Sequence, residues 1–193
     1  MAESDANESD DPSEGTLCTG VVTISSDRGL EDDPAGSAIA DALETAGSEI
    51  TVREHVNSDY DQIQSIVSRL IDRDDVDVVI TAGGTGVEPT DDTIEAVEPL
   101  LEKELTAFGD LITTLSYEQI GTRVVTVRTL SGVAEGTAIF CLPGIVETVE
   151  LALNEIILVE GTTIVERLRG DGPNAAADPD AEPNDVDAAD RDP

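Results

Sequence analysis

Apolar runs typical of strands alternate along this 193-residue chain with apolar positions at helical spacing. The run VDVVITA at 76–82 is rich in branched residues and has no polar position at its centre, which is typical of a strand covered on both faces. Helical spacing is clear in 59–71, where Ser58 or Asp59 could serve as the N-cap. Strands are predicted over 18–26, 49–56, 76–82, 124–127 and 137–144. Helices are predicted over 36–46, 59–71, 93–104, 108–119 and 146–157.

The alternation of strands and helices predicts an α/β fold with a mostly parallel sheet and helices on both faces. Ligands in such folds bind beyond the carboxyl ends of the strands. The loops 25–36, 82–92 and 143–145 all follow predicted strands. A binding site is therefore expected where these three loops meet.

Both ends of the chain differ in composition from the middle. Residues 1–14 carry six acidic and no basic side chains, and 171–193 carry eight acidic side chains against Arg191 alone. Neither segment could bury enough apolar surface to offset the entropy lost on ordering. We therefore expect 1–14 and 171–193 to be disordered acidic tails and 15–170 to form one domain with a single core.

The domain itself is strongly acidic. The formal net charge is −33, of which the tails contribute −13 (14 acidic residues and one arginine), which leaves −20 for the domain. Lys103 is the only lysine among the ten basic residues. Such a surface repels itself at ordinary ionic strength, whereas at about 1 M salt the screening length falls to about 3 Å. We therefore predict adaptation to a very salty, halophilic cytoplasm.

Composition also limits the partners. Nucleic acid is not expected, because no Lys/Arg cluster is present to displace counterions from a phosphate backbone. No apolar stretch approaches the length of a bilayer, and the N-terminus lacks the features of a secretion signal, so a cytoplasmic protein is expected. Cys18 and Cys141 each lie in an apolar run and are expected to be buried; with His55 they form no recognisable zinc site.

The segment TAGGTGVEPTDDT at 81–93 follows the buried strand and is the main candidate for chemistry. Its glycines at 83, 84 and 86 permit a positive φ and let backbone amides approach a ligand without a Cβ in the way. Free amides in such a turn, near the start of a helix, form an anion-binding site. Neither the P-loop motif nor the dinucleotide-binding motif is complete here. Spacing alone fits a phosphate-binding loop and a plain turn equally well.

The carboxylates of Asp91 and Asp92 also have two interpretations. Thr90, Asp91 or Asp92 could cap the following helix, with Glu95 completing a capping box from Asp92. Beside a bound phosphate, a carboxylate would instead need a cation, and with Mg²⁺ it becomes a metal ligand. One of the two carboxylates can cap the helix while the other serves the chemistry.

Five motifs in order, TAGGTG, PTDDTIEAV, ELTAFGD, LSYEQIG and FCLPG, resemble those of the MoaB/Mog family of molybdenum cofactor biosynthesis, over about 21–158. The resemblance implies a three-layer α/β sandwich that assembles as a homo-oligomer, a trimer or a hexamer. It also implies adenylylation of molybdopterin, in which the terminal phosphate of the pterin displaces pyrophosphate from ATP with the help of Mg²⁺. Such transfers need charge neutralisation and in-line positioning more than a strong base.

The resemblance also implies roles for individual residues. Catalytic roles fall on Asp91 and Asp59, and Asp91 would hold Mg²⁺ or its water. Apart from the resemblance, arginines such as Arg28 or Arg123 could add to the field of the glycine amides, so that an acidic surface does not preclude an anionic substrate. Substrate-binding residues implied by the motifs are Ser25, Asp27, Asp33, Gly36, Gly83, Gly84, Thr85, Gly86, Thr93, Ser116, Pro143 and Gly144.

Several positions depart from the family pattern. Ala35, Ala82 and Ile145 stand where the family commonly has small polar residues, Ser58 stands where it has a second aspartate, and Asp27 is displaced by one position. Each lost hydroxyl could remove a hydrogen bond to a charged phosphate, worth about 1.5–3 kcal/mol when buried. A non-catalytic molybdopterin-binding or scaffold protein is therefore the alternative. A third possibility, the related domain of nicotinamide mononucleotide deamidase proteins, is disfavoured by LSYEQIG.

Overall fold

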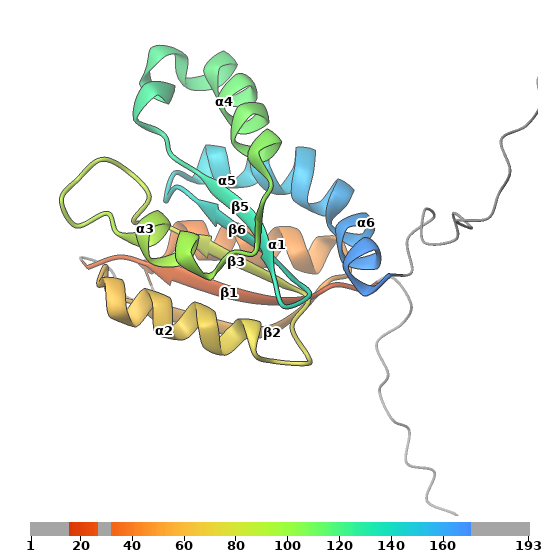
Figure 1. Ribbon diagram of the computed structural model, residues 1–193. Helices are drawn as coiled ribbons and strands as arrows, with labels where there is room; N and C mark the ends of the chain where they lie inside the picture. Colours follow the sequence, from red (N-terminus) through yellow and green to blue (C-terminus); the bar gives the residue numbers. More distant parts are fainter. Residues whose placement is uncertain (1–15, 27–31, 171–193) are drawn as a thin grey trace, which may run out of the picture.

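The computed structural model of the chain describes residues 16–26 and 32–170 (Figure 1). The predictions for the tails at 1–14 and 171–193, and for Asp27 and Arg28, lie outside the described residues. Within them, the chain forms one six-stranded sheet with helices packed on both of its faces. The predicted α/β class and the layered arrangement are confirmed.

The sheet is parallel at its centre and antiparallel at one edge, in the order β2-β1-β3-β6-β5-β4. Strands β2, β1, β3 and β6 run parallel, while β5 and β4 are antiparallel to their neighbours. The four parallel strands therefore end at the same side of the sheet. The strands are β1 (Cys18–Ile24), β2 (Glu49–Val56), β3 (Val78–Ala82), β4 (Lys103–Glu104), β5 (Leu130–Ala134) and β6 (Thr137–Leu142).

Successive side chains of the central strands enter two separate hydrophobic clusters, one on each face of the sheet. In β6, Phe140 packs in one cluster and its neighbour Ile139 in the other. This alternation is the two-residue period of a strand, and it explains why strands covered on both faces are apolar throughout. One face carries α1 (Pro34–Thr45), α4 (Thr106–Ile120), α5 (Val146–Ala152) and α6 (Leu158–Arg169), and the other carries α2 (Tyr60–Ile71) and α3 (Thr93–Val97).

Aspartates begin the first two helices. Asp59 is the N-cap of α2, where its Oδ1 accepts a hydrogen bond from the Gln62 backbone N–H at 3.0 Å. Asp33 caps α1 in the same way, accepting from Gly36 N–H at 2.9 Å, and Pro34 follows in the first turn. Such caps satisfy amides that have no partner inside the helix. The prediction that a polar residue at 58 or 59 begins this helix is confirmed.

Two predicted elements are wrong. The helix expected over 93–104 is α-helical only to Val97 and continues as a 3₁₀ turn (Glu98–Leu100), because Pro99 has no N–H to donate and its ring disfavours the preceding helical turn. The strand expected over 124–127 is instead the end of a 3₁₀ helix, η3 (Gly121–Thr126). Val125 in η3 is 82% exposed, so its apolar character marks no buried strand.

Two strands, β4 and β5, were not predicted. Strand β5 forms a hairpin with β6 through Glu135 and Gly136, whose φ values of +49° and +86° are those of a tight hairpin turn. Gly132 interrupts the apolar pattern of β5; a Cβ there would lie 2.5 Å from the Lys103 backbone oxygen of β4. The predicted helix over 146–157 is also longer than expected. It passes through a π-helical turn (Leu153–Ile157) and continues as α6.

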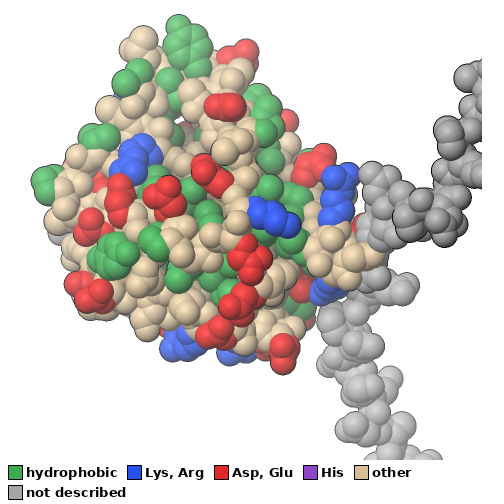
Figure 2. Space-filling model, in the orientation of Figure 1, with side chains coloured by type: hydrophobic (Ala, Val, Ile, Leu, Met, Phe, Trp, Pro, Cys, Tyr) green, Lys and Arg blue, Asp and Glu red, His purple; other side chains and the backbone are tan. Residues whose placement is uncertain are grey.

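The described surface is acidic, and most of its basic side chains are paired. In Figure 2 carboxylates are spread over the visible face, with basic groups among them. Of the eight basic residues in the described ranges, five form ion pairs: Arg53 with Asp33, Arg69 with Glu54, Arg73 with Asp75, Arg128 with Glu95, and Arg169 with Asp77. No helix in these ranges is long and apolar enough to cross a membrane.

The cysteines differ in exposure. Cys141 in β6 is buried, as expected, and burial raises the pKa of its thiol to about 12. Cys18 at the start of β1 is only partly buried. The protonated Cys141 thiol packs as a small apolar side chain and contributes to the core.

Candidate functional site

A cavity of about 820 Å³ lies beyond the carboxyl ends of β1, β3 and β6. All three predicted loops contribute to it within the described residues: 25–26 after β1, 83–91 after β3 and 143–145 after β6. A further wall comes from the end of α4 and from η3, and another from Glu147 at the start of α5. The cavity has the size of a small-molecule site, and its position matches the expectation for parallel sheets.

The glycine loop can only be built with glycine at its first two positions. Gly83 has a φ of +106°, and a Cβ there would lie 2.2 Å from the backbone oxygen of Ile24. Gly84 has a φ of +62°, and a Cβ there would lie 2.5 Å from Thr93 Oγ1. The absence of side chains lets the loop pack against the end of β1 while its backbone lines the cavity.

Thr93 supports this loop through two hydrogen bonds. It is the first residue of α3 and is fully buried, and its Oγ1 donates a hydrogen bond to the Gly83 oxygen at 2.8 Å. Its backbone N–H donates to the Gly84 oxygen at 2.9 Å. Thr93 does not line the cavity. Its observed contacts are those of a residue that fixes the loop conformation.

Asp91 lines the cavity and closes the end of the loop. Its Oδ2 accepts a hydrogen bond from the Glu88 N–H at 2.9 Å, and its own N–H donates to the Glu88 oxygen at the same distance. A Cβ at Gly86 would lie 2.6 Å from the same Oδ2. Among the described residues, the other carboxylate oxygen of Asp91 accepts no hydrogen bond. One oxygen of Asp91 is therefore free to contact a ligand or a metal ion.

The capping box that Asp92 and Glu95 could have formed at the start of α3 does not form. Asp92 occupies the N-cap position, but its side chain accepts no hydrogen bond from the helix. Glu95, its expected partner, instead binds Arg128, whose Nη2 donates to Glu95 Oε1 at 2.6 Å. The helix start is held by the Thr93 backbone bond to Gly84. Asp91 is therefore a residue of the cavity wall, whereas Asp92 is a weak cap.

Arg128, which follows η3, connects the glycine loop to Glu95 in α3. Its Nη1 donates to the Gly86 oxygen at 3.1 Å, while its Nη2 binds Glu95. Burial would raise the pKa of the Glu95 carboxyl, but the hydrogen bond from Arg128, a backbone hydrogen bond and the charge of Arg128 together outweigh burial and lower it. Sequence patterns gave no sign of this contact, because Gly86 and Arg128 are 42 residues apart.

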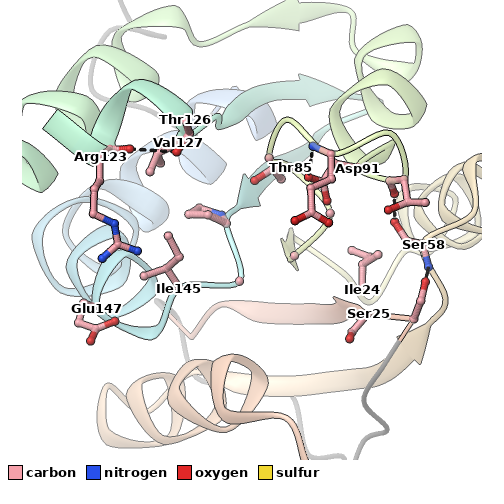
Figure 3. Close-up of a pocket in the computed structure, with 18 of the residues that line it drawn as sticks. Ile24, Ser25, Ser58, Thr85, Asp91, Arg123, Thr126, Val127, Ile145 and Glu147 are labelled. Carbon is pink, nitrogen blue, oxygen red and sulfur yellow. Dashed lines mark hydrogen bonds between the residues drawn. The ribbon is translucent and has the colours of Figure 1, made fainter. Parts of the chain in front are cut away.

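The far wall of the cavity carries charges of both signs. In Figure 3, Arg123 from η3 and Glu147 from α5 lie on the opposite side from Thr85 and Asp91. Sequence patterns did not identify Glu147, which stands in the first turn of α5, where an acidic residue also favours the helix dipole. Ile145 lies between the two walls, at the N-cap of α5, so an apolar side chain occupies this part of the cavity.

Ser58 lies in the cavity wall, and Asp59 does not. The Ser58 hydroxyl donates to the backbone oxygen of Thr90, which ties the end of β2 to the glycine loop. The Asp59 carboxylate caps α2. The position beside the loop is therefore occupied by a hydroxyl rather than by a carboxylate.

The structure gathers only part of the predicted substrate-binding set. The members that line the cavity are Ser25, 83–86, Pro143 and Gly144, and the predicted catalytic residue Asp91 lines it as well. Asp33 and Gly36 lie at the start of α1, where a Cβ on Gly36 would clash with the Asp33 carboxylate at 2.1 Å. Ser116 is buried in α4, and its hydroxyl has no hydrogen-bond partner among the described residues. These three residues and Asp59 lie outside the cavity lining.

A small hollow of about 20 Å³ lies beside Asp33 and shares Ser25 and Gly144 with the main cavity. His55 lies in its wall; its ring nitrogens are 3.2 Å from Thr23 Oγ1 and 3.2 Å from the Ser25 backbone oxygen. The Ser25 oxygen can only accept, so Nε2 carries the proton of that hydrogen bond. His55 thus supports the end of β1, as a packed residue.

Comparison with known proteins agrees with the geometry. Residues 16–163 match the family described as a probable molybdopterin binding domain. Molybdenum cofactor biosynthesis protein B of Bacillus cereus is 41% identical over 141 residues, which are 72% of this chain and 83% of that protein. The chain resembles a crystal structure of a molybdenum cofactor biosynthesis protein B with a TM-score of 0.77 and 38% identity, covering 80% of this chain and 96% of that one.

A second solved structure is similar to a lesser degree. It is described as the tungsten cofactor synthesizing protein MoaB from Pyrococcus furiosus, with a TM-score of 0.72 and 34% identity. The match covers 80% of this chain and 98% of that one. The family match spans most of the chain, and it includes all the described walls of the cavity. The chain belongs to the MoaB/Mog family of molybdopterin-binding proteins.

Proposed function

We propose that this protein acts in molybdenum cofactor biosynthesis by adenylylating molybdopterin with ATP, as a nucleotidyltransferase. The observation that carries the proposal is the position of the Asp91 carboxylate beside the glycine backbone, in one cavity at the carboxyl ends of the parallel strands. Family membership supports molybdopterin as the substrate. The adenylyl transfer itself is inferred from the chemistry that this cavity could support.

In the proposed reaction, an oxygen of the terminal phosphate of molybdopterin forms a bond to the α-phosphorus of ATP. The bond from that phosphorus to the β-bridging oxygen breaks, and pyrophosphate leaves with the electron pair. A phosphate monoester is largely deprotonated at neutral pH, so the nucleophile needs no strong base. The chain has to hold the two anions in line. The Gly83 N–H donates to the Leu142 oxygen at 2.9 Å, so the backbone at 84–86 together with Asp91 supplies the fixed contacts for doing so.

The residues present fit a magnesium ion that arrives with the nucleotide. No group of three or more His, Cys, Asp or Glu side chains suited to a metal was found among the described residues. Magnesium commonly binds through one or two carboxylates and completes its shell with substrate phosphates and water. Asp91, with one oxygen not hydrogen-bonded, is the residue that would hold it. When bound, Mg²⁺ would neutralise charge developing on the phosphates.

A binding or scaffold role without transfer is the second candidate, and one observation favours it. The cavity position nearest the end of β2 carries Ser58, whose hydroxyl is bonded to the Thr90 oxygen, while the Asp59 carboxylate caps α2. A second carboxylate is therefore missing from this side of the cavity. Glycine amides and Asp91 would remain sufficient to bind the pterin.

We also propose that the protein acts in the cytoplasm as a homo-oligomer. Three apolar side chains of α4 and η3 are exposed: Leu111 is 49% exposed, Tyr117 56% and Val125 82%. Assembly would reduce this exposure. Light scattering at molar KCl would give the assembly size. A monomer at all protein concentrations would refute this part of the proposal.

The test is single-turnover formation of adenylylated molybdopterin from ATP and Mg²⁺ at molar KCl. Asp91→Asn is the test variant, and Asp92→Asn is its matched control, because Asp92 is adjacent but makes no side-chain bond to α3 and does not line the cavity. We expect Asp91→Asn to lose product formation with little change in molybdopterin affinity, and Asp92→Asn to retain both. Tight molybdopterin binding by the wild type without product would instead establish the binding role.

A further inference from the structure

We propose that Arg123 binds a phosphate group of a ligand, at the end of the cavity opposite the glycine loop. The inference rests on the proposed function, because it assumes that the cavity holds phosphorylated ligands. It adds a second anion subsite to the one expected at 83–86. Figure 3 shows Arg123 extending from η3 along its own wall of the cavity toward Ile145 and Glu147, on the side opposite Thr85 and Asp91.

The charges that line the cavity favour such a contact. Three of the described lining residues are carboxylates, namely Glu88, Asp91 and Glu147, and Arg123 is the only basic side chain among them. The described wall therefore carries a net charge of −2 (three negative, one positive). A phosphate at the end of the cavity away from the glycine amides would meet only repulsion, unless a cation lay at the same end.

Arg123 is also available for a ligand. In a chain with 43 acidic and 10 basic residues, ion-pair partners are abundant, and five described arginines have one. The Arg123 guanidinium forms no ion pair and no hydrogen bond with the described residues. Lys103 and Arg167 are unpaired as well, but neither lines the cavity. Arg123 thus combines an unpaired charge with a place in the wall.

Glu147 does not form an ion pair with Arg123. Its carboxylate lines the same part of the cavity but lies beyond ion-pair distance of Arg123. It stands in the first turn of α5, where it is favourably placed at the positive end of the helix dipole. Arg123 can therefore bind a ligand without first breaking a salt bridge.

A direct contact is the interaction that would survive in a salty cytoplasm. Long-range attraction between exposed charges is removed at about 1 M salt. A guanidinium and a phosphate in contact keep two parallel hydrogen bonds, which salt weakens less. The bound phosphate could belong to the nucleotide or to the pterin, since both carry one.

The experiment measures the affinity of the full chain for each ligand separately, by titration calorimetry at molar KCl. The probes are molybdopterin alone and an α,β-methylene ATP analogue with Mg²⁺, which cannot transfer its adenylyl group. The variants are Arg123→Gln, Arg123→Lys and the control Arg167→Gln, which removes an unpaired arginine of α6 outside the cavity. The Arg123 side chain is exposed and forms no ion pair or hydrogen bond with the described residues, so we expect both Arg123 variants to fold.

We expect Arg123→Gln to weaken one ligand about tenfold or more, Arg123→Lys to weaken it less, and Arg167→Gln to leave it unchanged. A loss confined to the ATP analogue assigns the subsite to the nucleotide, and a loss confined to molybdopterin assigns it to the pterin. Unchanged affinity for both ligands in Arg123→Gln would overturn the proposal. So would an equal loss in Arg167→Gln, which would indicate a general charge effect.

Failure of the proposed function would give a different result. A wild-type chain that binds molybdopterin but not the ATP analogue refutes adenylylation, while the ratio of molybdopterin affinities between Arg123→Gln and wild type still decides the role of Arg123. A wild-type chain that binds neither ligand refutes both proposals.

Discussion

Replacing Gly83 by alanine separates the cost of a close backbone contact from the cost of an unusual backbone conformation. Gly83 and Gly47 both have positive φ, +106° and +74°. A Cβ at Gly47 would meet nothing within 4 Å, whereas at Gly83 it would lie 2.2 Å from the Ile24 backbone oxygen. Gly47→Ala therefore carries the conformational cost alone and is the matched control.

The expected magnitudes follow from these two terms. An L-residue in the left-handed region costs about 1–2 kcal/mol, which is the term expected for Gly47→Ala. At Gly83, whose φ of +106° lies farther from that region, the conformational term is at least as large. At Gly83 the added methyl must displace backbone at the end of β1, and such overpacking typically costs about 1–3 kcal/mol more. For a domain of this size the additional loss corresponds to a Tm about 2–12 °C below that of Gly47→Ala.

Thermal and urea unfolding at molar KCl, followed by circular dichroism, would measure the difference. If Gly83→Ala loses less stability than expected, the loop must have moved to relieve the clash. Molybdopterin affinity would then fall in Gly83→Ala but not in Gly47→Ala. Equal stability and equal affinity in the two variants would refute the reasoning, since the clash would then have no consequence.

Three further predictions concern the loop and the charges. Arg128→Gln removes the hydrogen bond to the Gly86 oxygen, so we expect molybdopterin affinity to fall. The free energy of unfolding should drop by only about 0.2–1 kcal/mol, because the Arg128–Glu95 pair is partly exposed. Calorimetry would measure the affinity and urea unfolding the stability, and a large stability loss with unchanged affinity would contradict the prediction. Because Arg128 lowers the pKa of Glu95 in the folded state, the pair should stabilise the fold above the ordinary pKa of 4.5 and lose this contribution as the pH falls through the lower folded-state value. Glu95→Gln should lack that part of the pH dependence of unfolding, and identical curves would count against it. Finally, the Tm should rise from low salt to molar KCl, as self-repulsion is screened; a Tm independent of salt would rule out the predicted salt adaptation.

Elements with strong local signals could be predicted from the sequence. The branched run of β3 and the apolar spacing of α2 each lie within a dozen residues, and both elements were found. β5 was missed because Ser131 and Gly132 break its apolar pattern. What makes LSGVA a strand is its hairpin with β6 and its contact with β4, which are properties of the fold.

The candidate site shows the same division. The glycines at 83, 84 and 86 were recognisable because a positive φ or a close approach leaves few other residues possible. The bond from Arg128 to Gly86 was not, since side chains 42 residues apart leave no common pattern. Asp92 and Glu95 had the spacing of a capping box, but Arg128 attracted Glu95 away. A local rule was overridden there by a tertiary ion pair.

The walls of the cavity come from segments that span the chain from Ile24 to Glu147. An N-terminal fragment of the chain cannot form the cavity, because β6 and α5 contribute to its walls. During synthesis β6 must first be made and must then pair with β3, which precedes it in the chain. A ligand that touches both walls binds only the complete fold, and at a hundredfold excess over its Kd it would add about 2.7 kcal/mol to the free energy of unfolding. The amount of folded protein would therefore rise and fall with the supply of the molecule that it binds.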